Sequence, residues 1–528
     1  MNFWPFSRAK DSKLSKGYDV VRPEFEDQRR PAYIEHKGED KQVTTAQRNK
    51  IINLNRDLMR NSPESVLQDQ QVRVNVVGCV GGKLYAEFGE GGKSAADAVM
   101  KFFNKKWCRH AEFTRGEDFN TLLKNVLTAV NVNGDMILVF DDGILTGKNG
   151  SGRIRGFEGD EIANVPRDEF EKRFPKTYTQ VDGIVLNECG MICGAFVSTS
   201  QRGRKVFNPQ DGFITLKADP FDDEKVPNWI IVADVRRFNQ VRGISPSVSA
   251  ATTALDLHES RGSEAQAAKL NSKMVYQILK GETSDPGAAS SIPGFAPIGA
   301  AGAQGSGADG GKEEIDVTPL KNIGAIGINN PQGVKTEIMD TKRPNPNFQN
   351  YAQFMAGIQG GVRGLPRVYS TLQVQNSYAG FRGEQKIAEQ SFNETKKLLE
   401  RHVCDWAARC AISRAAKIGI ISAALPDEWW DMIAWRWPEP PEVSVKDAEA
   451  GRAQKMKNGM TSLRRELGPG EVEKIIAERA KEKALFDAAG LIYPGEETAS
   501  GHLKDDGPSD EESEGDEDKD NTQGGDNA

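Results

Sequence analysis

The 528-residue sequence has few cysteines and histidines and no long apolar segment. Its six cysteines are too few for the disulfide framework of a secreted protein. Cys189 and Cys193 form one close pair without a second pair of metal ligands, so we expect reduced thiols, no structural metal and no cofactor. No run approaches the roughly 20 apolar residues of a membrane helix. The basic N-terminus also lacks the apolar core of a signal peptide, which predicts synthesis and assembly in a cytoplasm without membrane insertion.

Familiar catalytic motifs are also lacking. Residues 89–94 (GEGGKS) resemble a phosphate-binding loop, but Glu87 stands where the first glycine of that motif is required. The five histidines are scattered singly, so no general base stands in a recognisable constellation. The acidic pairs Asp141–Asp142 and Asp222–Asp223 lie next to predicted turns, where we expect solvated carboxylates. The sequence thus predicts a protein that is not an enzyme, and an enzyme with an unrecognised acidic pair remains the alternative from another class.

The formal charge of −7 is unevenly distributed along the chain. Residues 504–528 hold eleven acidic residues and two lysines, a contribution of −9, which leaves +2 for residues 1–503. We expect residues 491–528 to form a disordered acidic tail and residues 1–44 to form a flexible arm. The near-neutral remainder has no basic run of the kind that tight binding to DNA requires.

The first half of the chain predicts an α+β fold. Helical spacing indicates helices at residues 45–61, 95–104 and 119–130. Alternating or continuous apolar residues indicate strands at residues 71–80 and 135–142, a hairpin at 181–198 and a short strand at 229–235.

The second half predicts long helices separated by an irregular segment. Ser245–Pro246 is a typical helix start, and the following residues are Ala-rich to residue 280, with a weak point at Gly262. A Gly/Ala-rich stretch covers residues 281–311, and an extended segment follows it. A second helix is expected at residues 345–360, ending at Gly360–Gly361, and residues 361–378 have no helical or strand period. A long helix at about 380–419 and a charged helical region at 445–489 complete the chain.

Four segments, in this order, resemble the portal proteins of lambda-like tailed bacteriophages. Residues 238–270 contain an Arg-Gly-Ile-Ser-Pro turn at 242–246, before a helix ending in Ala-Ala-Lys. Residues 347–385 contain a Gly-Leu-Pro turn at 364–366 and an Asn-Ser-Tyr-Ala start of a long helix at 376–379. Residues 440–470 resemble a late family motif, and residues 102–140 resemble elements of its first domain.

This resemblance implies a portal fold that assembles as a ring. Its parts would be a wing (45–240), a stem helix (245–280), a clip (281–343), a second stem helix (345–360), a tunnel loop (361–378), a long wing helix (379–425) and a helical crown (440–490). The family implies a homo-oligomeric ring, typically a dodecamer, at one capsid vertex of the virion. Double-stranded DNA would pass through it without sequence specificity during packaging and ejection. The implied protein partners are the terminase large subunit, the major capsid protein, the scaffold and a head–tail adaptor.

Three groups of candidate residues follow from the resemblance. Tunnel-loop residues expected to face DNA are Arg363, Arg367, Tyr369, Ser370, Thr371, Gln373, Gln375 and Asn376. Gly360 and Gly361 are candidates for a hinge, or for a simple helix C-cap. Terminase contacts in the clip are expected at Lys312, Glu313, Glu314 and Asp316. The rival structural interpretation is another phage head protein, either a head–tail adaptor or a scaffold.

Overall fold

The computed structural model describes residues 43–89, 91–146, 150–198, 213–217, 226–273, 276–278, 316–320, 325–329, 345, 347–374, 377–438, 445–463 and 471–489. The chain divides into two compact units, Met1–Val443 and Ser444–Ala528. The predicted arm, the Gly/Ala-rich stretch, the acidic tail and the pair Asp222–Asp223 lie outside the described residues, apart from residues 43 and 44. Among the helices described, none combines the length and the apolar character needed to cross a membrane.

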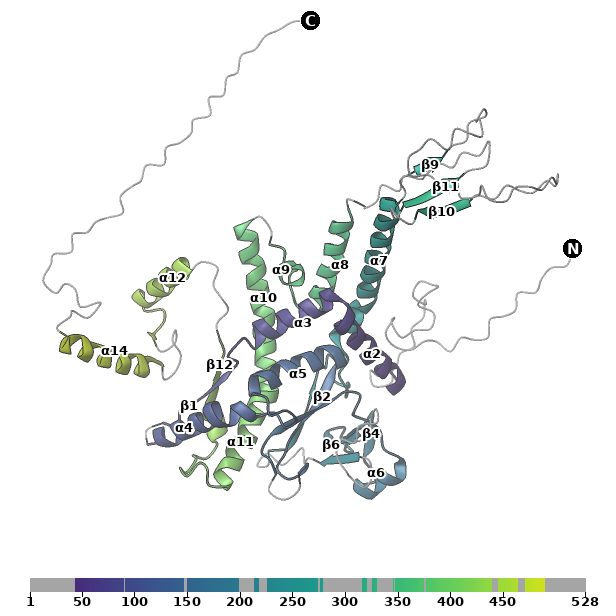
Figure 1. Ribbon diagram of the computed structural model, residues 1–528. Coiled ribbons are helices and arrows are strands. Elements are labelled where there is room, and N and C mark those ends of the chain that lie inside the picture. Colours follow the sequence, from purple (N-terminus) through teal and green to yellow (C-terminus); the bar gives the residue numbers. More distant parts are fainter. Residues whose placement is uncertain are drawn as a thin grey trace, which may run out of the picture. The chain divides into compact units, whose positions relative to one another are not determined.

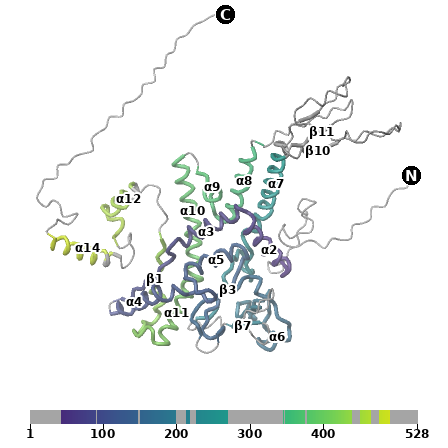
Figure 2. Tube along the Cα trace, viewed as in Figure 1, coloured from purple at the N-terminus to yellow at the C-terminus, as the bar shows by residue number. Residues whose placement is uncertain are grey.

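Helices form most of the first unit (Figures 1 and 2). They are α2 (Thr45–Asn61), α3 (Pro63–Val76), α4 (Lys93–Met100), the π-helical η2 (Lys101–Trp107), η3 (Cys108–His110), α5 (Phe119–Asn133), α6 (Arg167–Arg173), η5 (Pro246–Ala250), α7 (Ala251–Lys273), α8 (Phe348–Val362), α9 (Arg367–Thr371), α10 (Tyr378–Leu399), the π-helical η7 (Glu400–Cys404), α11 (Asp405–Lys417) and η8 (Trp429–Met432). The second unit contains α12 (Val445–Lys457) and α14 (Glu471–Ala488).

The strands of the first unit form four small sheets. They are β1 (Lys83–Ala86), β2 (Asp135–Phe140), β3 (Ile154–Glu158), β4 (Thr179–Val181), β5 (Ile184–Leu186), β6 (Ile192–Ser198), β7 (Phe213–Lys217), β8 (Trp229–Ala233), β9 (Tyr276–Ile278), β10 (Asp316–Leu320), β11 (Ala325–Asn329) and β12 (Ile433–Arg436). The sheet orders are β3-β2-β8, β4-β5-β6-β7, β1-β12 and β10-β11-β9. All neighbours are antiparallel except β11 and β9. Helices and sheets together confirm the predicted α+β class.

Strand β2 is buried on both faces and joins the two main layers of the core. Met136, Leu138 and Phe140 contribute to the hydrophobic cluster that includes residues of α5 and α11. Ile137 and Val139 contribute to a second cluster with residues of the four-stranded sheet. Because successive side chains of a strand point to opposite faces, the continuous apolar run MILVF at residues 136–140 is what this position requires.

The prediction of a strand at residues 71–80 is wrong. Residues 63–76 form helix α3, which begins at Pro63 after Ser62, whose side chain accepts a hydrogen bond from the Ser65 amide. Its buried positions include Ser65, Gln68 and Asp69, so polar residues occupy much of the face that packs inward. The valines alternate in this stretch and imitate a strand, whereas the burial follows a helical spacing.

The long helical rod predicted at about 380–419 is present as α10, η7 and α11, which run without a break from Tyr378 to Lys417. Ser377 caps its start by accepting a hydrogen bond from the Gly380 amide at 3.4 Å. The predicted helix from Ser245 begins with η5 and continues as α7 only to Lys273, and residues 276–278, predicted to belong to it, form strand β9 instead. The predicted weak point at Gly262 lies inside the intact helix. Figure 1 shows α7, α8 and α10 directed away from strands β2, β4 and β6.

Candidate functional site at helices α7 to α10

A buried ionic cluster fixes the point where the α/β body meets helix α7. Arg242 is 3% exposed and binds both carboxylate oxygens of Asp135, at 2.5 and 2.9 Å. The same guanidinium donates to the Gly159 carbonyl at 2.8 Å, and the Gly243 amide donates to Asp135 at 2.9 Å. Burial alone would lower the pKa of Arg242, but Asp135 and then Asp182 outweigh it and raise that pKa. The pair is therefore a permanent ion pair that holds the Arg-Gly turn against the end of β2.

A second arginine connects this cluster to the N-terminal helix α2. Arg48 donates to Asp182 at 2.7 Å and also to the Gly243 carbonyl. Asp182 lies at the tip of the β4–β5 hairpin, with a left-handed φ of 49°. Burial would raise the pKa of Asp182, but Arg242 and Arg48 outweigh burial and lower it. Helix α2, the hairpin and the base of α7 are thus joined by alternating charges.

The start of η5, which leads into α7, is capped as its sequence predicts. Ser245 accepts from the Ser247 amide at 3.2 Å, and its hydroxyl donates to the Asn131 carbonyl at the end of α5. Pro246 occupies the first helical position, where no amide donor is needed.

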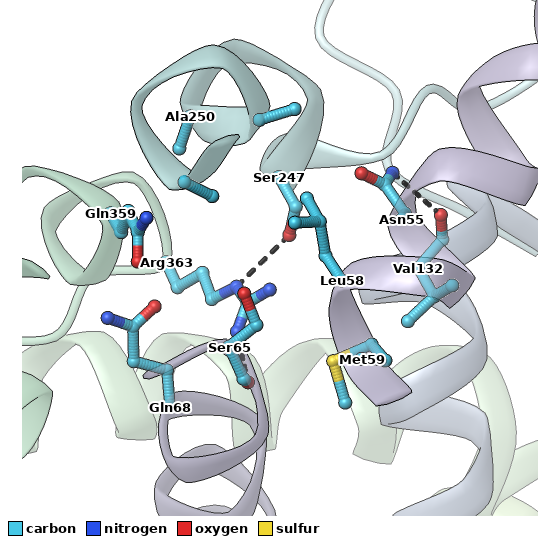
Figure 3. A pocket seen from close by; sticks show the side chains of 12 residues that line it. Asn55, Leu58, Met59, Ser65, Gln68, Val132, Ser247, Ala250, Gln359 and Arg363 are labelled. Atoms are coloured by element: carbon cyan, nitrogen blue, oxygen red, sulfur yellow. Dashed lines mark hydrogen bonds between the residues drawn. The ribbon is translucent and has the colours of Figure 1, made fainter. Parts of the chain in front are cut away.

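Hydrogen bonds of polar side chains connect α8 and its C-terminal end to α3 and the base of α7 (Figure 3). Arg363 donates to Ser247 Oγ and to the Ser65 carbonyl, each at 3.0 Å. Gln68 donates to the Ala356 carbonyl at 3.1 Å. Burial lowers the pKa of Arg363, while Asp69 partly opposes that shift. Arg363 was expected to face DNA, and here it holds α8 against α3 and the base of α7 instead, so we remove it from the proposed contact residues.

The two glycines of the proposed hinge lie in different surroundings. A Cβ atom at Gly360 would come within 1.7 Å of Ser370 Oγ, whereas a Cβ at Gly361 would meet nothing within 4 Å. Helix α8 does not end at these residues but continues to Val362, and Gly364, with φ of +71°, supplies the left-handed turn. Gly360 is therefore required by the close approach of α8 and α9, and a hinge at Gly361 stays a prediction.

Residues 367–371, expected to be irregular, form the short helix α9. Ser370 is completely buried and donates to the Leu365 and Pro366 carbonyls, so we also remove it from the proposed contact residues. Tyr369 is half-buried and packs edge-to-face on Phe392 of α10, with 5.6 Å between ring centroids. Gly364-Leu365-Pro366 ends α8 and precedes α9. The packing of Tyr369 on α10 stabilises a helix here although the local helical pattern of the sequence is weak.

The remaining tunnel-loop candidates are exposed or partly exposed. Arg367 is exposed and donates to Gln353 of α8, and Thr371 donates to the Arg367 carbonyl at 2.9 Å. Gln373 is exposed between Leu372 and Val374, which are 58% and 62% exposed. Gln375 and Asn376 lie outside the described residues.

Of the clip candidates, only Asp316 is described. It is the first residue of β10 and pairs with Asn329 of β11. Lys312, Glu313 and Glu314 lie outside the described residues.

Helix α8 presents an uncharged, apolar face to solvent. None of its 15 residues carries a charge at neutral pH. Tyr351, Phe354 and Ile358 are 42%, 65% and 41% exposed, and Gly357 and Gly361 beside them have open space around them. Phe348 and Tyr351 also line an open hollow with Asp256 and Glu259 of α7. Such a face, rimmed by polar residues, is typical of a surface that another protein covers.

Among the described residues, no group of three or more His, Cys, Asp or Glu side chains could hold a metal ion. The six cysteines are all free thiols. Burial, with a smaller contribution from Asp118, raises the pKa of Cys108 to about 12, so its thiol stays protonated.

An α/β body holds the base of helices α7 and α8, and the exposed uncharged face of α8 is typical of a structural subunit that other chains contact. The chain belongs to the lambda family of phage portal proteins, whose model matches residues 28–387. That family is structural rather than enzymatic, with a portal or head–tail connector role.

Two solved structures are similar to this chain. One, from the virion of a native gene transfer agent particle, has 13% identity and a TM-score of 0.40, covering 78% of this chain and 89% of that chain. Another, from the neck of an empty gene transfer agent particle computed with C6 symmetry, has 12% identity and a TM-score of 0.43, covering 84% and 94%. No curated protein matches the chain.

Proposed function

We propose that copies of this chain form the ring-shaped portal of a tailed phage or phage-like particle, through which double-stranded DNA enters and leaves the capsid. The ring would occupy one capsid vertex of the virion, bind terminase at the clip during packaging, and later carry the head–tail adaptor. Family membership supports the portal role. The ring number, the capsid and scaffold contacts and assembly in the host cytoplasm belong to the same proposal.

The exposed face of α8 is the observation that carries this proposal. Leaving Phe354, Tyr351 and Ile358 in water is unfavourable, since complete burial of one such side chain contributes about 1.5–3 kcal/mol. If this face contacts a different face of the next copy, repetition of that contact gives a ring when the rotation between copies closes. The hollow between α7 and α8 offers the next copy a concave surface.

In a ring, the neutral and the charged side chains proposed to face the DNA would have different roles. Each exposed residue would recur once per subunit and form a girdle around the duplex. Neutral groups such as Thr371 and Gln373 offer weak, exchangeable contacts to phosphate, which lets DNA slide. Arg367 would hold more tightly, because charged contacts to phosphate dominate affinity for DNA.

Phe354→Asp tests the proposed ring. We expect a folded subunit that no longer assembles, because the substitution places a charge in the middle of the apolar face. Native mass spectrometry and negative-stain microscopy of the purified protein would measure assembly, and circular dichroism would check folding.

Gln349→Glu is the matched control, since Gln349 is exposed on the same helix but away from that face. It adds the same charge, and its rings should match those of the wild type. A wild-type protein that stays monomeric, or a Phe354→Asp protein that still forms rings, would contradict the proposal.

The rival interpretations, an adaptor or scaffold and an enzyme, have no observation in their favour among the described residues. Purified rings should therefore hydrolyse no ATP.

A further inference from the structure

Helix α10 and the start of η7 carry a row of basic side chains on their exposed face. Arg382, Lys386, Lys397 and Arg401 are all exposed, at sequence steps of four, eleven and four. At 100° per residue these steps place the four side chains within one exposed stripe. We call these four residues the basic stripe. The opposite face is buried, with Ala388, Phe392 and Leu399 no more than 5% exposed.

The acidic residues of the same helix are mostly turned inward. Glu384 accepts a hydrogen bond from the Val368 amide at 2.9 Å, and Glu400 accepts one from the Trp437 indole. Glu389 is half-buried and acts electrostatically on Tyr369 and Lys396. Glu394 is the one exposed acid on α10. The exposed face therefore carries four positive charges against one negative charge, although the helix as a whole is nearly balanced.

This arrangement differs from that of a helix face that is merely solvated. In α6 the surface charges alternate, and Arg167–Glu171 and Lys172–Glu169 form ion pairs at 2.8 and 2.7 Å. In α10 the i,i+4 neighbours Arg382 and Lys386, and likewise Lys397 and Arg401, carry the same charge, which destabilises a helix by itself. Within the described part of the chain, none of the four forms a salt bridge. A polyanion that neutralises them would remove this repulsion.

We propose that the basic stripe binds the phosphate backbone of double-stranded DNA, as a contact additional to the tunnel loop. Its ends, Arg382 and Arg401, are nineteen residues apart, which corresponds to about 28 Å along a helix. Over that length a duplex offers many phosphates, since it carries one charge per roughly 1.7 Å. The stripe offers neutral Gln390 and Asn393 between its charges and no aromatic side chain. It therefore suits contacts that are electrostatic and independent of base sequence.

The proposal rests on the portal function and specifies a second place where DNA touches the subunit. The other candidate occupant of the stripe is the next copy of the chain, whose Asp256 and Glu259 line the hollow beside α7. Two exposed acids would leave half of the stripe unneutralised, so the observations favour DNA.

The double variant Lys386→Gln, Lys397→Gln tests the proposal in the assembled full-length protein. Binding to a short fluorescent duplex of mixed sequence would be followed by anisotropy at several salt concentrations. Each lost phosphate contact lowers the slope of log affinity against log salt by about 0.9. We expect the slope to fall by about 2, and the loss of affinity between about 50 and 200 mM salt to become about tenfold smaller.

The matched control is Lys172→Gln, Lys176→Gln, which removes two exposed lysines at and just beyond α6. It should leave the slope unchanged. An unchanged slope in the α10 variant, or an equal decrease in the control, would overturn the proposal.

Assembly of the same samples separates the possible failures. If the α10 variant does not form rings that the wild type forms, the stripe is a subunit contact and the DNA proposal is wrong. If the wild type itself forms no ring, the portal proposal fails. The salt slope of the monomer then still shows whether the stripe binds DNA.

Discussion

At the scale of single residues, the largest difference from expectation is Asp141. Its position beside a predicted turn indicated a solvated carboxylate, yet it is completely buried. It accepts hydrogen bonds from the Ser151 amide at 2.7 Å, the Leu145 amide at 3.0 Å and the Thr146 hydroxyl at 2.8 Å. The sequence showed the turn but not that Leu145, Thr146 and Ser151 surround the carboxylate, because these contacts carry no local sequence signal.

Asp141→Asn should reveal how much this hydrogen-bonded carboxylate contributes to the stability of the fold. Burial raises the pKa of Asp141, but the hydrogen bonds from Ser151, Thr146 and Leu145 outweigh burial and lower it to about 2. Its ionised form therefore stabilises the fold fully above the ordinary value of 3.8, and this contribution is lost as pH falls toward 2. We expect Asn to lower the free energy of unfolding by about 1–3 kcal/mol at neutral pH, since an amide cannot accept all of these bonds.

Thermal unfolding of both proteins between about pH 2 and pH 7 measures this effect. The difference between wild type and variant should shrink as the pH falls. Asp142→Asn is the control, because Asp142 is 40% exposed and pairs with Arg414 at the surface. It should cost less than about 1 kcal/mol. An equal loss in both variants would contradict the role assigned to Asp141.

At the scale of elements, apolar periodicity predicted α2, α5, β2, β8 and the long helix α10–α11, because in these segments most of the buried residues are apolar. It failed for α3, whose buried face contains Ser65, Gln68 and Asp69. Ser62-Pro63-Glu64 was a start signal that could have identified this helix. It failed again for α9, a five-residue helix too short to show a period and stabilised by Phe392 and Leu365.

Alanine substitutions at Gly360 and Gly361 of α8 should have opposite effects on stability. Gly360→Ala should separate α8 from α9, because the added Cβ would overlap Ser370 Oγ. Gly361→Ala meets open space and should stabilise the helix by about 0.4–1 kcal/mol. Thermal unfolding of both purified variants checks these signs.

Packaging assays on the same two variants address the hinge. A stable Gly361→Ala protein that assembles but fails to package DNA would support a hinge at that residue. Normal packaging would leave Gly361 as an ordinary exposed helical position.

At the scale of the whole molecule, contacts between distant parts of the sequence could not be predicted. Strand β1 pairs with β12 across about 350 residues, and Asn104 bonds the backbone of Leu84 beside them. The Arg242-Gly243 turn was visible as a motif, but its partners Asp135 and Arg48 carry no local signal. The candidate site was likewise only partly predictable: the tunnel loop stays a prediction, while the hydrogen bonds of Arg363, the burial of Ser370 and the stripe on α10 emerge from packing.

Shortening the tip between Leu372 and Asn376 tests the proposed tunnel loop in whole particles. This change leaves the packed helix α9 untouched, so rings should form as in the wild type. We expect capsids that package or retain little DNA, measured as nuclease-protected DNA per particle. Glu188→Ser, on another exposed turn, is the control and should package normally. Full DNA content in the shortened variant would contradict the loop's role.

The cluster around Arg242 has a consequence for the order in which the chain folds. Its partners come from residues 48, 135, 159 and 182, so the salt bridges that hold the base of α7 can close only after α2, β2 and the β4–β5 hairpin have met. Closing such distant contacts is slow compared with forming a helix. We therefore expect α7 to be helical early and to acquire its final direction late, so that newly made chains present a competent association surface only once their bodies are complete.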